Sequence, residues 1–130
     1  MALNDPLANV LASIVNYEKT GKKELAVRIS SKTIKKVLDI MKDGMYIGKY
    51  EEGKDHSGAF LKINLLGNIN KCGVIKPRFS VKKTEYEKFE KRYLPAKDFG
   101  FLIVSTPQGI MMHEKAKEKG IGGKLIAYVY

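Results

Sequence analysis

The last 26 residues of the chain, Ser105 to Tyr130, constrain its fold more than any other stretch. A small polar cluster at 105–109 follows an apolar run, and a short charged segment then leads to Gly120, Gly122 and Gly123 and to an apolar final strand. Glycine allows the dihedrals and close approaches that tight turns need, and loops between buried strands often form binding sites. The ending therefore predicts two small-residue loops, carried by buried strands, that can approach an extended polar ligand.

The charge of the chain indicates the class of that ligand. The 130 residues include 24 Lys and Arg against 14 Asp and Glu, which gives a net charge of +10. Such a surface attracts polyanions over a Debye length of about 10 Å. Hydrophobic residues make up 44% of the chain, which excludes a disordered basic tail. Nucleic acid is therefore the leading class of partner.

Several other classes are disfavoured. No apolar run approaches the roughly 18 residues that span a bilayer, and the N-terminus lacks the basic-then-apolar order of a signal peptide. We therefore expect a cytoplasmic protein without membrane contact. Cys72 is the single cysteine, so it can form neither an intramolecular disulfide nor a multi-cysteine zinc site, and we expect it to be buried. No metal and no cofactor are expected.

The first half of the chain predicts an α-β-α-β-β lobe. Asp5-Pro6 is typical of a helix start, and Ser30 or Ser31 is expected to cap the second helix, whose apolar residues recur at helical spacing. The last two strands are expected to form a hairpin with a long polar tip at 51–58. The five predicted elements span residues 5–20, 25–29, 31–43, 45–50 and 59–66.

The second half predicts a lobe of mostly β-strands with short helices. Thr84 and Glu87 fit a capping box, and Pro77 is expected to end a short strand. The predicted elements are strands at 74–75, 99–104, 110–112 and 125–130 and helices at 84–93 and 113–119. The fold class is therefore α+β in two small lobes, 1–67 and 68–130. Their charge excesses are +3 and +7, so the second lobe is the expected RNA- or DNA-binding lobe.

Two motifs that suggest enzymes fail on single residues. The His113-Glu114 pair lacks the second histidine of a zinc protease, because position 117 is lysine. The glycines at 120–124 lack the P-loop glycine at position 118 and the Ser or Thr at position 125. The sequence therefore predicts that the protein is not an enzyme.

The small-residue loops also have plain structural explanations. Hydroxyls beside glycine usually cap a turn, and the residues alone favour that role for Ser105 and Thr106, which lack the G-x-S-x-G elbow of a hydrolase. The glycines at 120–123 fit a tight turn and a close approach to a ligand equally well. Tyr86, Phe89 and Tyr93 have the spacing of the core side of a helix, whereas Arg78 and Phe79 lie beyond a proline, where they could reach nucleic acid.

Motifs along the whole chain resemble one known family. The C-terminal patterns are S-T-x-x-G-I-M, H-E-x-A and G-x-G-G-K-L-I-A-Y-V-Y, and further matches are Asp5-Pro6, Ser30-Ser31-Lys32 and C-G-V-I-K-P-R-F at 72–79. Together they resemble the ribosomal small-subunit protein eight family. The tyrosine-ended terminus and K-P-R-F at 76–79 are closer to its archaeal and eukaryotic branch than to the bacterial one.

The resemblance implies a structural constituent of the small ribosomal subunit. Such a protein binds a hairpin in the central domain of small-subunit ribosomal RNA, supports subunit assembly, contacts neighbouring ribosomal proteins, and is expected to be a monomer off the ribosome. The alternative is a translational repressor that binds its own operon messenger RNA, as bacterial relatives do. Pro107 departs from the family pattern, which commonly has serine there. The expected RNA-binding residues are Ser105, Thr106, Gly109, Gly122, Gly123, Lys124, Gln108, Lys76, Arg78, Phe79 and Lys32.

Overall fold

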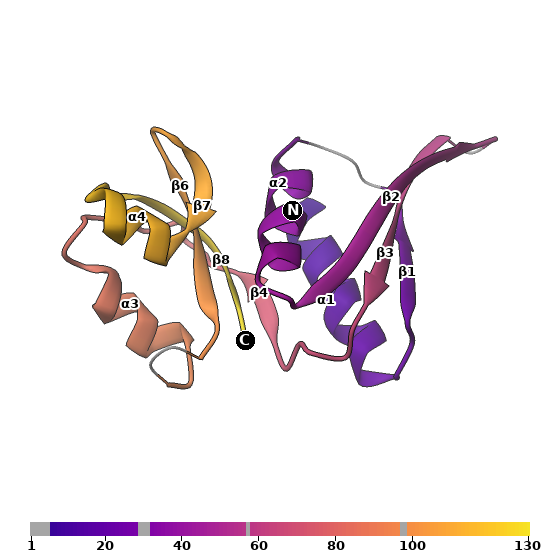
Figure 1. Ribbon diagram of the computed structural model, residues 1–130, viewed down its shortest axis with the longest axis horizontal. Coiled ribbons are helices and arrows are strands. Elements are labelled where there is room, and N and C mark those ends of the chain that lie inside the picture. Colours follow the sequence, from indigo (N-terminus) through magenta and orange to yellow (C-terminus); the bar gives the residue numbers. More distant parts are fainter. Residues whose placement is uncertain (1–5, 29–31, 57, 97–98) are drawn as a thin grey trace. The chain divides into compact units, whose positions relative to one another are not determined.

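The computed structural model describes residues 6–28, 32–56, 58–96 and 99–130. The chain forms two compact units, residues 1–70 and 71–130. The described residues form four helices and two antiparallel sheets, which confirms the α+β class (Figure 1). No helix in these described ranges is long and apolar enough to cross a membrane.

The first unit has the predicted α-β-α-β-β order. Its three-stranded sheet runs β1-β3-β2, and apolar side chains of both helices are buried. The predicted helix caps Asp5, Ser30 and Ser31 lie outside the described residues. The stripe of the second helix is buried as its spacing predicts, at Ile34, Val37, Leu38 and Met41. The elements are α1 (Pro6–Lys19), β1 (Glu24–Val27), α2 (Lys32–Asp43), β2 (Ile47–Asp55) and β3 (Gly58–Leu65).

The long hairpin tip predicted at 51–58 is wrong. Strands β2 and β3 remain paired out to Asp55 and Gly58, so the charged residues at 51–55 belong to a strand. Their side chains are largely exposed, and polar residues on a solvent-facing side do not interrupt pairing. From Gly53 to Asp55 the two strands form a ribbon beyond the end of β1. Arg28 donates two hydrogen bonds of 2.9 Å to the carboxylate of Asp55 and ties this ribbon to the end of β1.

The second unit is a five-stranded sheet and two helices, whose buried side chains contribute to one core. Strand order is β4-β8-β6-β7, and β5 pairs with β8 beside β4. Leu102, Val104 and Leu125 from the central strands form one buried cluster with Tyr86 and Phe89 of the first of these helices. The elements are β4 (Cys72–Val74), β5 (Ser80–Val81), α3 (Tyr86–Tyr93), β6 (Phe101–Thr106), β7 (Gly109–Met112), α4 (His113–Lys119) and β8 (Gly123–Val129). Cys72 is buried, as expected.

Three local predictions in this unit need correction. The capping box at Thr84 and Glu87 is wrong, because α3 begins at Tyr86 with no side-chain cap. Instead, Glu85 Oε1 accepts a 2.9 Å hydrogen bond from the backbone N–H of Lys82. The short strand β5 was not predicted. The strand expected at 99–104 in fact spans Phe101–Thr106, and Phe99 is exposed, so the small polar cluster begins inside a strand.

Candidate nucleic-acid interface

Three polar side chains lie in one row across the second sheet. Lys124 of β8 is paired in register with Ser80 of β5 on one side and with Ser105 of β6 on the other. Directly opposite residues of antiparallel strands share a face, with Cβ atoms about 5 Å apart. All three side chains are exposed. The sheet therefore presents an ammonium group between two hydroxyl groups.

The turn after Ser105 is held by Thr106. The Thr106 hydroxyl donates a 2.7 Å hydrogen bond to the carbonyl of Gly109 and accepts a 3.2 Å bond from the backbone N–H of Gln108. Thr106 is only 8% exposed, whereas Ser105 next to it is on the surface. The turn-capping explanation is thus confirmed for Thr106.

The other residues of this turn are on the surface. Gly109 has a φ of 120°, which favours glycine, and no atom lies within 4 Å of where a Cβ would be. Gln108 and Pro107 are exposed, and Gln108 Oε1 accepts a 3.3 Å hydrogen bond from Lys119 Nζ. The Gly109 backbone is therefore open to a ligand.

Gly122 and Gly123 are required by strand contacts. A Cβ at Gly123 would overlap the carbonyl oxygen of Ser105, and a Cβ at Gly122 would overlap the carbonyl oxygen of Val81. Gly120 instead ends α4 in the left-handed conformation with a φ of 68°. The three glycines thus allow a tight turn followed by a close approach of β8 to both neighbouring strands.

The residues after β4 occupy different environments. Lys76 and Arg78 are exposed on either side of Pro77. Phe79 is half-buried, with its ring centroid 5.4 Å from that of Phe89 and 5.0 Å from the guanidinium carbon of Arg92. The ring of Phe79 therefore packs against the core of the unit, while its two basic neighbours face solvent.

Lys32 belongs to the first unit. It is the first residue of α2, and its side chain is exposed. The other predicted site residues all lie in the second unit, around the ends of β5, β6 and β8 and the connection from β4 to β5.

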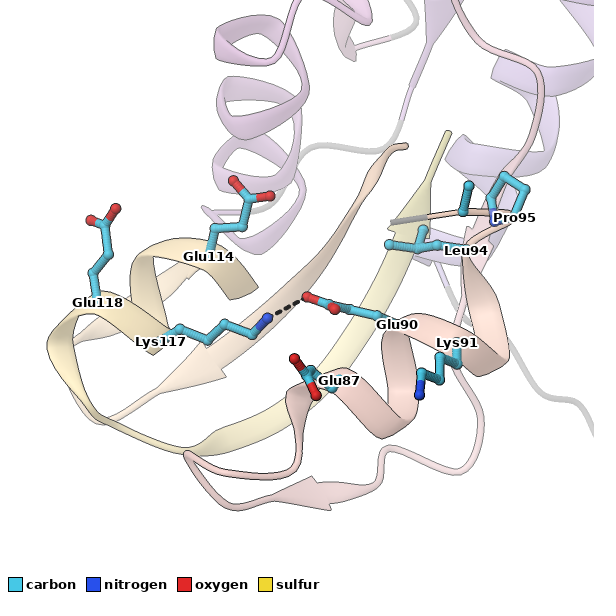
Figure 2. A pocket seen from close by; sticks show the side chains of 9 residues that line it. Glu87, Glu90, Lys91, Leu94, Pro95, Glu114, Lys117 and Glu118 are labelled. Carbon is cyan, nitrogen blue, oxygen red and sulfur yellow. Dashed lines mark hydrogen bonds and ion pairs between the residues drawn. The ribbon is translucent and has the colours of Figure 1, made fainter. Parts of the chain in front are cut away.

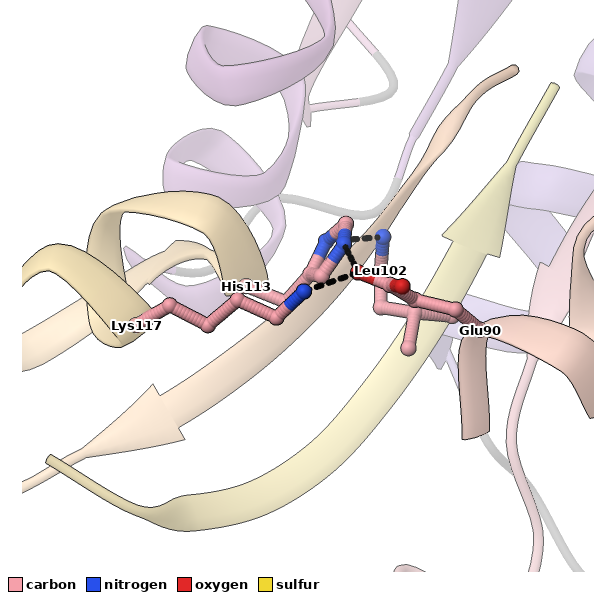
Figure 3. Close-up of polar contacts among 4 residues, drawn as sticks. All are labelled: Glu90, Leu102, His113 and Lys117. Atoms are coloured by element: carbon pink, nitrogen blue, oxygen red, sulfur yellow. Dashed lines mark hydrogen bonds and ion pairs between the residues drawn. The ribbon is translucent and has the colours of Figure 1, made fainter. Parts of the chain in front are cut away.

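A buried histidine is bonded to β6, the strand that carries Ser105. His113 is 1% exposed, and its Nδ1 accepts a 3.0 Å hydrogen bond from the backbone N–H of Leu102 (Figure 3). Nδ1 is then unprotonated, so Nε2 carries the proton and donates it to Glu90 Oε1, 2.6 Å away. The ring therefore links α4 to β6 and α3, and it has no role as a zinc ligand in this arrangement.

Glu90 is the charged centre of this network. Lys117 Nζ also donates a 2.6 Å hydrogen bond to Glu90 Oε1. Burial raises the pKa of the Glu90 carboxyl, but the hydrogen bonds that Lys117 and His113 donate, together with the positive charge of Lys117, outweigh that effect and lower the pKa below 4.5. On the same helix, the Tyr86 hydroxyl donates a 3.0 Å bond to the carbonyl of Ile121 and holds the loop before β8.

The segments around the row contain no acidic residues. Neither Asp nor Glu occurs at 71–84, 105–113 or 119–130, the segments that contain β4, β5, β7, β8, the turn after β6 and the connection from β4 to β5. A phosphate backbone approaching this end of the sheet would meet exposed cations and hydroxyls without repulsion from these segments. The exposed cations of these segments include Lys76, Arg78, Lys82, Lys83 and Lys124.

The model of one known family, ribosomal protein S8, matches residues 5–130. The chain belongs to the ribosomal protein S8 family. This is a family of structural, RNA-binding proteins of the small ribosomal subunit and not a family of enzymes. The resemblance that the sequence motifs indicated is thus confirmed, while the archaeal and eukaryotic branch stays a prediction.

Ser80 is the one residue of the row that the sequence did not predict as a site residue. It lies in the two-residue strand β5, which is too short to give a periodic signal. Its position beside Lys124 follows only from the pairing of β5 with β8. The proximity of Arg78, a predicted site residue, was the one available hint.

Proposed function

We propose that this S8-family protein binds a hairpin of small-subunit ribosomal RNA through the row Ser80, Lys124 and Ser105, and thereby supports subunit assembly. The observation that carries the proposal is the exposed, in-register row at an end of the sheet where the neighbouring segments lack acidic residues. RNA helices present 2′-hydroxyl groups, which both donate and accept hydrogen bonds, beside phosphates. The serine hydroxyls can bond the 2′-hydroxyl groups, and the Lys124 ammonium can neutralise a phosphate.

The neighbouring residues have distinct roles in this proposal. Gly109 supplies an open backbone surface, and Gln108 offers a side-chain amide at the same turn. Thr106 acts by holding that turn, so its effect on binding comes through Gly109 and Gln108. Gly122 and Gly123 act by letting β8 approach β5 and β6, which brings Lys124 level with both serines.

The basic residues supply the electrostatic part of the affinity. Lys76 and Arg78 extend the positive surface from the row along the β4–β5 connection, and Lys32 is the corresponding contact proposed for the first unit. Neutralised phosphates release counterions, so each cation contributes to a salt-dependent affinity. The ring of Phe79 supports this connection from inside, because it packs on Phe89.

A footprint on small-subunit ribosomal RNA tests the proposal. Hydroxyl-radical cleavage with the parent protein should show one protected hairpin, and the double variant Ser105→Ala/Lys124→Ala should lose that protection at the same protein concentration. Lys49→Ala is the control, because Lys49 is an exposed lysine of the first unit with no ion pair among the described residues. Equal protection by the parent and the double variant would refute the proposed surface, and the absence of any protected hairpin would refute the RNA-binding function.

A further inference from the structure

A groove between α3 and α4 has the opposite charge to the rest of the second unit. Its volume is about 740 Å³, and four carboxylates and two ammonium groups line it, which gives the lining a charge of −2 (Figure 2). Residues 71–130 contain six acidic side chains against thirteen basic ones, so most of the acids of this unit lie in one place. The four carboxylates are Glu87, Glu90, Glu114 and Glu118.

Most of these carboxylates are available to a partner. Figure 2 shows Lys117 reaching from α4 to Glu90 of α3, so these two charges satisfy each other. Within the described part of the chain, the carboxylates of Glu87, Glu114 and Glu118 form no ion pair or hydrogen bond, although the protein carries an excess of cations. Unpaired carboxylates contributed by both helices therefore line the groove.

The groove also has an apolar end and a fixed centre. Leu94, Pro95 and Ala96, just beyond α3, form the apolar end. Glu90 forms the centre, where His113 and Lys117 hold its carboxylate in place through 2.6 Å contacts (Figure 3). A preorganised site binds a flexible partner at a lower entropic cost than a mobile one does.

We infer that this groove is a protein-docking surface for an extended segment rich in lysine and arginine. Charge complementarity is the argument: the basic side chains would face Glu87, Glu114 and Glu118, and an apolar side chain would lie against Leu94 and Pro95. RNA is disfavoured because these carboxylates would repel its phosphates. A bound metal ion is disfavoured because no three His, Cys, Asp or Glu of the described residues are grouped to hold one.

The inference concerns a protein partner and does not depend on the RNA-binding proposal. It assigns to this chain two faces of opposite charge: the acid-free row at the end of the sheet and the glutamate-lined groove between the helices. An S8-family chain placed in a ribosome would then use one face for RNA and the other for a basic segment of a neighbouring protein.

Amide NMR on the 130-residue protein tests the inference, with a short synthetic peptide of lysine, arginine and leucine as the probe. The peptide should cause saturable shifts of α3 and α4 amides. The double variant Glu87→Gln/Glu118→Gln should weaken its binding by about fivefold, as expected for two partly exposed charge pairs. Asp43→Asn/Glu51→Gln is the matched control, because it changes the net charge equally at two exposed carboxylates that form no ion pair among the described residues. This control should bind the peptide within about twofold of the parent.

Several outcomes would overturn the inference. Equal weakening in both double variants would mean that the peptide responds only to net charge. Saturable shifts of the same amides with Mg²⁺ alone, or with the ribosomal RNA hairpin, would assign the groove to those ligands. A dimer that dissociates in Glu87→Gln/Glu118→Gln would make a second copy of this chain the occupant. Affinity for the RNA hairpin should not fall in this variant, so the docking and RNA proposals can fail separately.

Discussion

Ser105 and Thr106 are adjacent in the sequence, but substitution of Ser105 should lower RNA affinity whereas substitution of Thr106 should lower stability. Ser105 is exposed, and its side chain makes no hydrogen bond within the described residues. Ser105→Ala should therefore leave the free energy of unfolding within about 0.5 kcal/mol of the parent. Affinity for the cognate hairpin should fall by about 1–3 kcal/mol, roughly 5- to 150-fold, because a polar RNA group loses its partner.

Thr106→Val should act mainly on stability. It removes the hydroxyl that joins the Gly109 carbonyl and the Gln108 N–H, while the side-chain size stays nearly constant. Two lost hydrogen bonds at about 1 kcal/mol each predict a loss of about 2 kcal/mol in unfolding free energy. For a chain of this size the melting temperature should drop by roughly 6–10 °C. Thr106→Ser keeps the hydroxyl and should recover most of this loss.

Two measurements separate these effects. Thermal unfolding reports stability, and titration with the cognate hairpin and with an unrelated RNA duplex reports specific and nonspecific affinity. Binding to the unrelated duplex depends on phosphates and should be nearly the same in all three variants. Should Ser105→Ala bind the hairpin as tightly as the parent while Thr106→Val stays fully stable, the roles assigned to both residues would be wrong. Recognition would then lie with Arg78 and its neighbours or with the first unit.

Three further predictions concern charge, close contact and pH. Lys124→Ala should flatten the slope of log K against log salt by about one unit for the hairpin, whereas Lys49→Ala should not, and equal slopes for all three proteins would remove Lys124 from the interface. Gly123→Ala should destabilise the fold by about 1–3 kcal/mol in urea unfolding, because the new Cβ overlaps the Ser105 carbonyl; parent-like stability would contradict this contact. Because folding lowers the pKa of Glu90 from 4.5, this carboxylate stabilises the protein above that pH and the stabilisation is lost as pH falls through the lowered pKa. Glu90→Gln should therefore reduce the loss of stability in acid, as measured by melting temperature between pH 6 and pH 3, and an unchanged acid response would exclude this linkage.

The sequence by itself determined the features that depend on local periodicity. The stripe of Ile34, Val37, Leu38 and Met41 predicted a buried helix face, and Gly120 marked the end of α4. Both signals come from residues within a few turns of one another, because helix hydrogen bonds and helix caps are local. The family motifs are likewise continuous stretches of sequence, and for that reason the family could be named before the fold was known.

Only the tertiary structure decided the pairing register of the strands and the face of the sheet on which each side chain lies. A strand side chain changes face with every residue, so the exposure of Ser105 and the burial of Thr106 depend on where β6 pairs with β7 and β8. Only that pairing places Ser80 beside Lys124. The role of Gly123 also depends on the neighbouring strand, since the obstacle to a Cβ there is the backbone of Ser105.

The sequence also does not reveal which charged residues become neighbours, as the acidic groove shows. Glu87 and Glu118 are separated in the sequence by β6 and β7, and each looks like an ordinary solvated residue of a short helix. They share a groove because α3 and α4 lie side by side in the second unit (Figure 2). A count of charges along the chain gave the sign of the net charge of the second lobe. Only the three-dimensional fold separates its acidic face from its basic one, because nonlocal contacts determine which charges become neighbours.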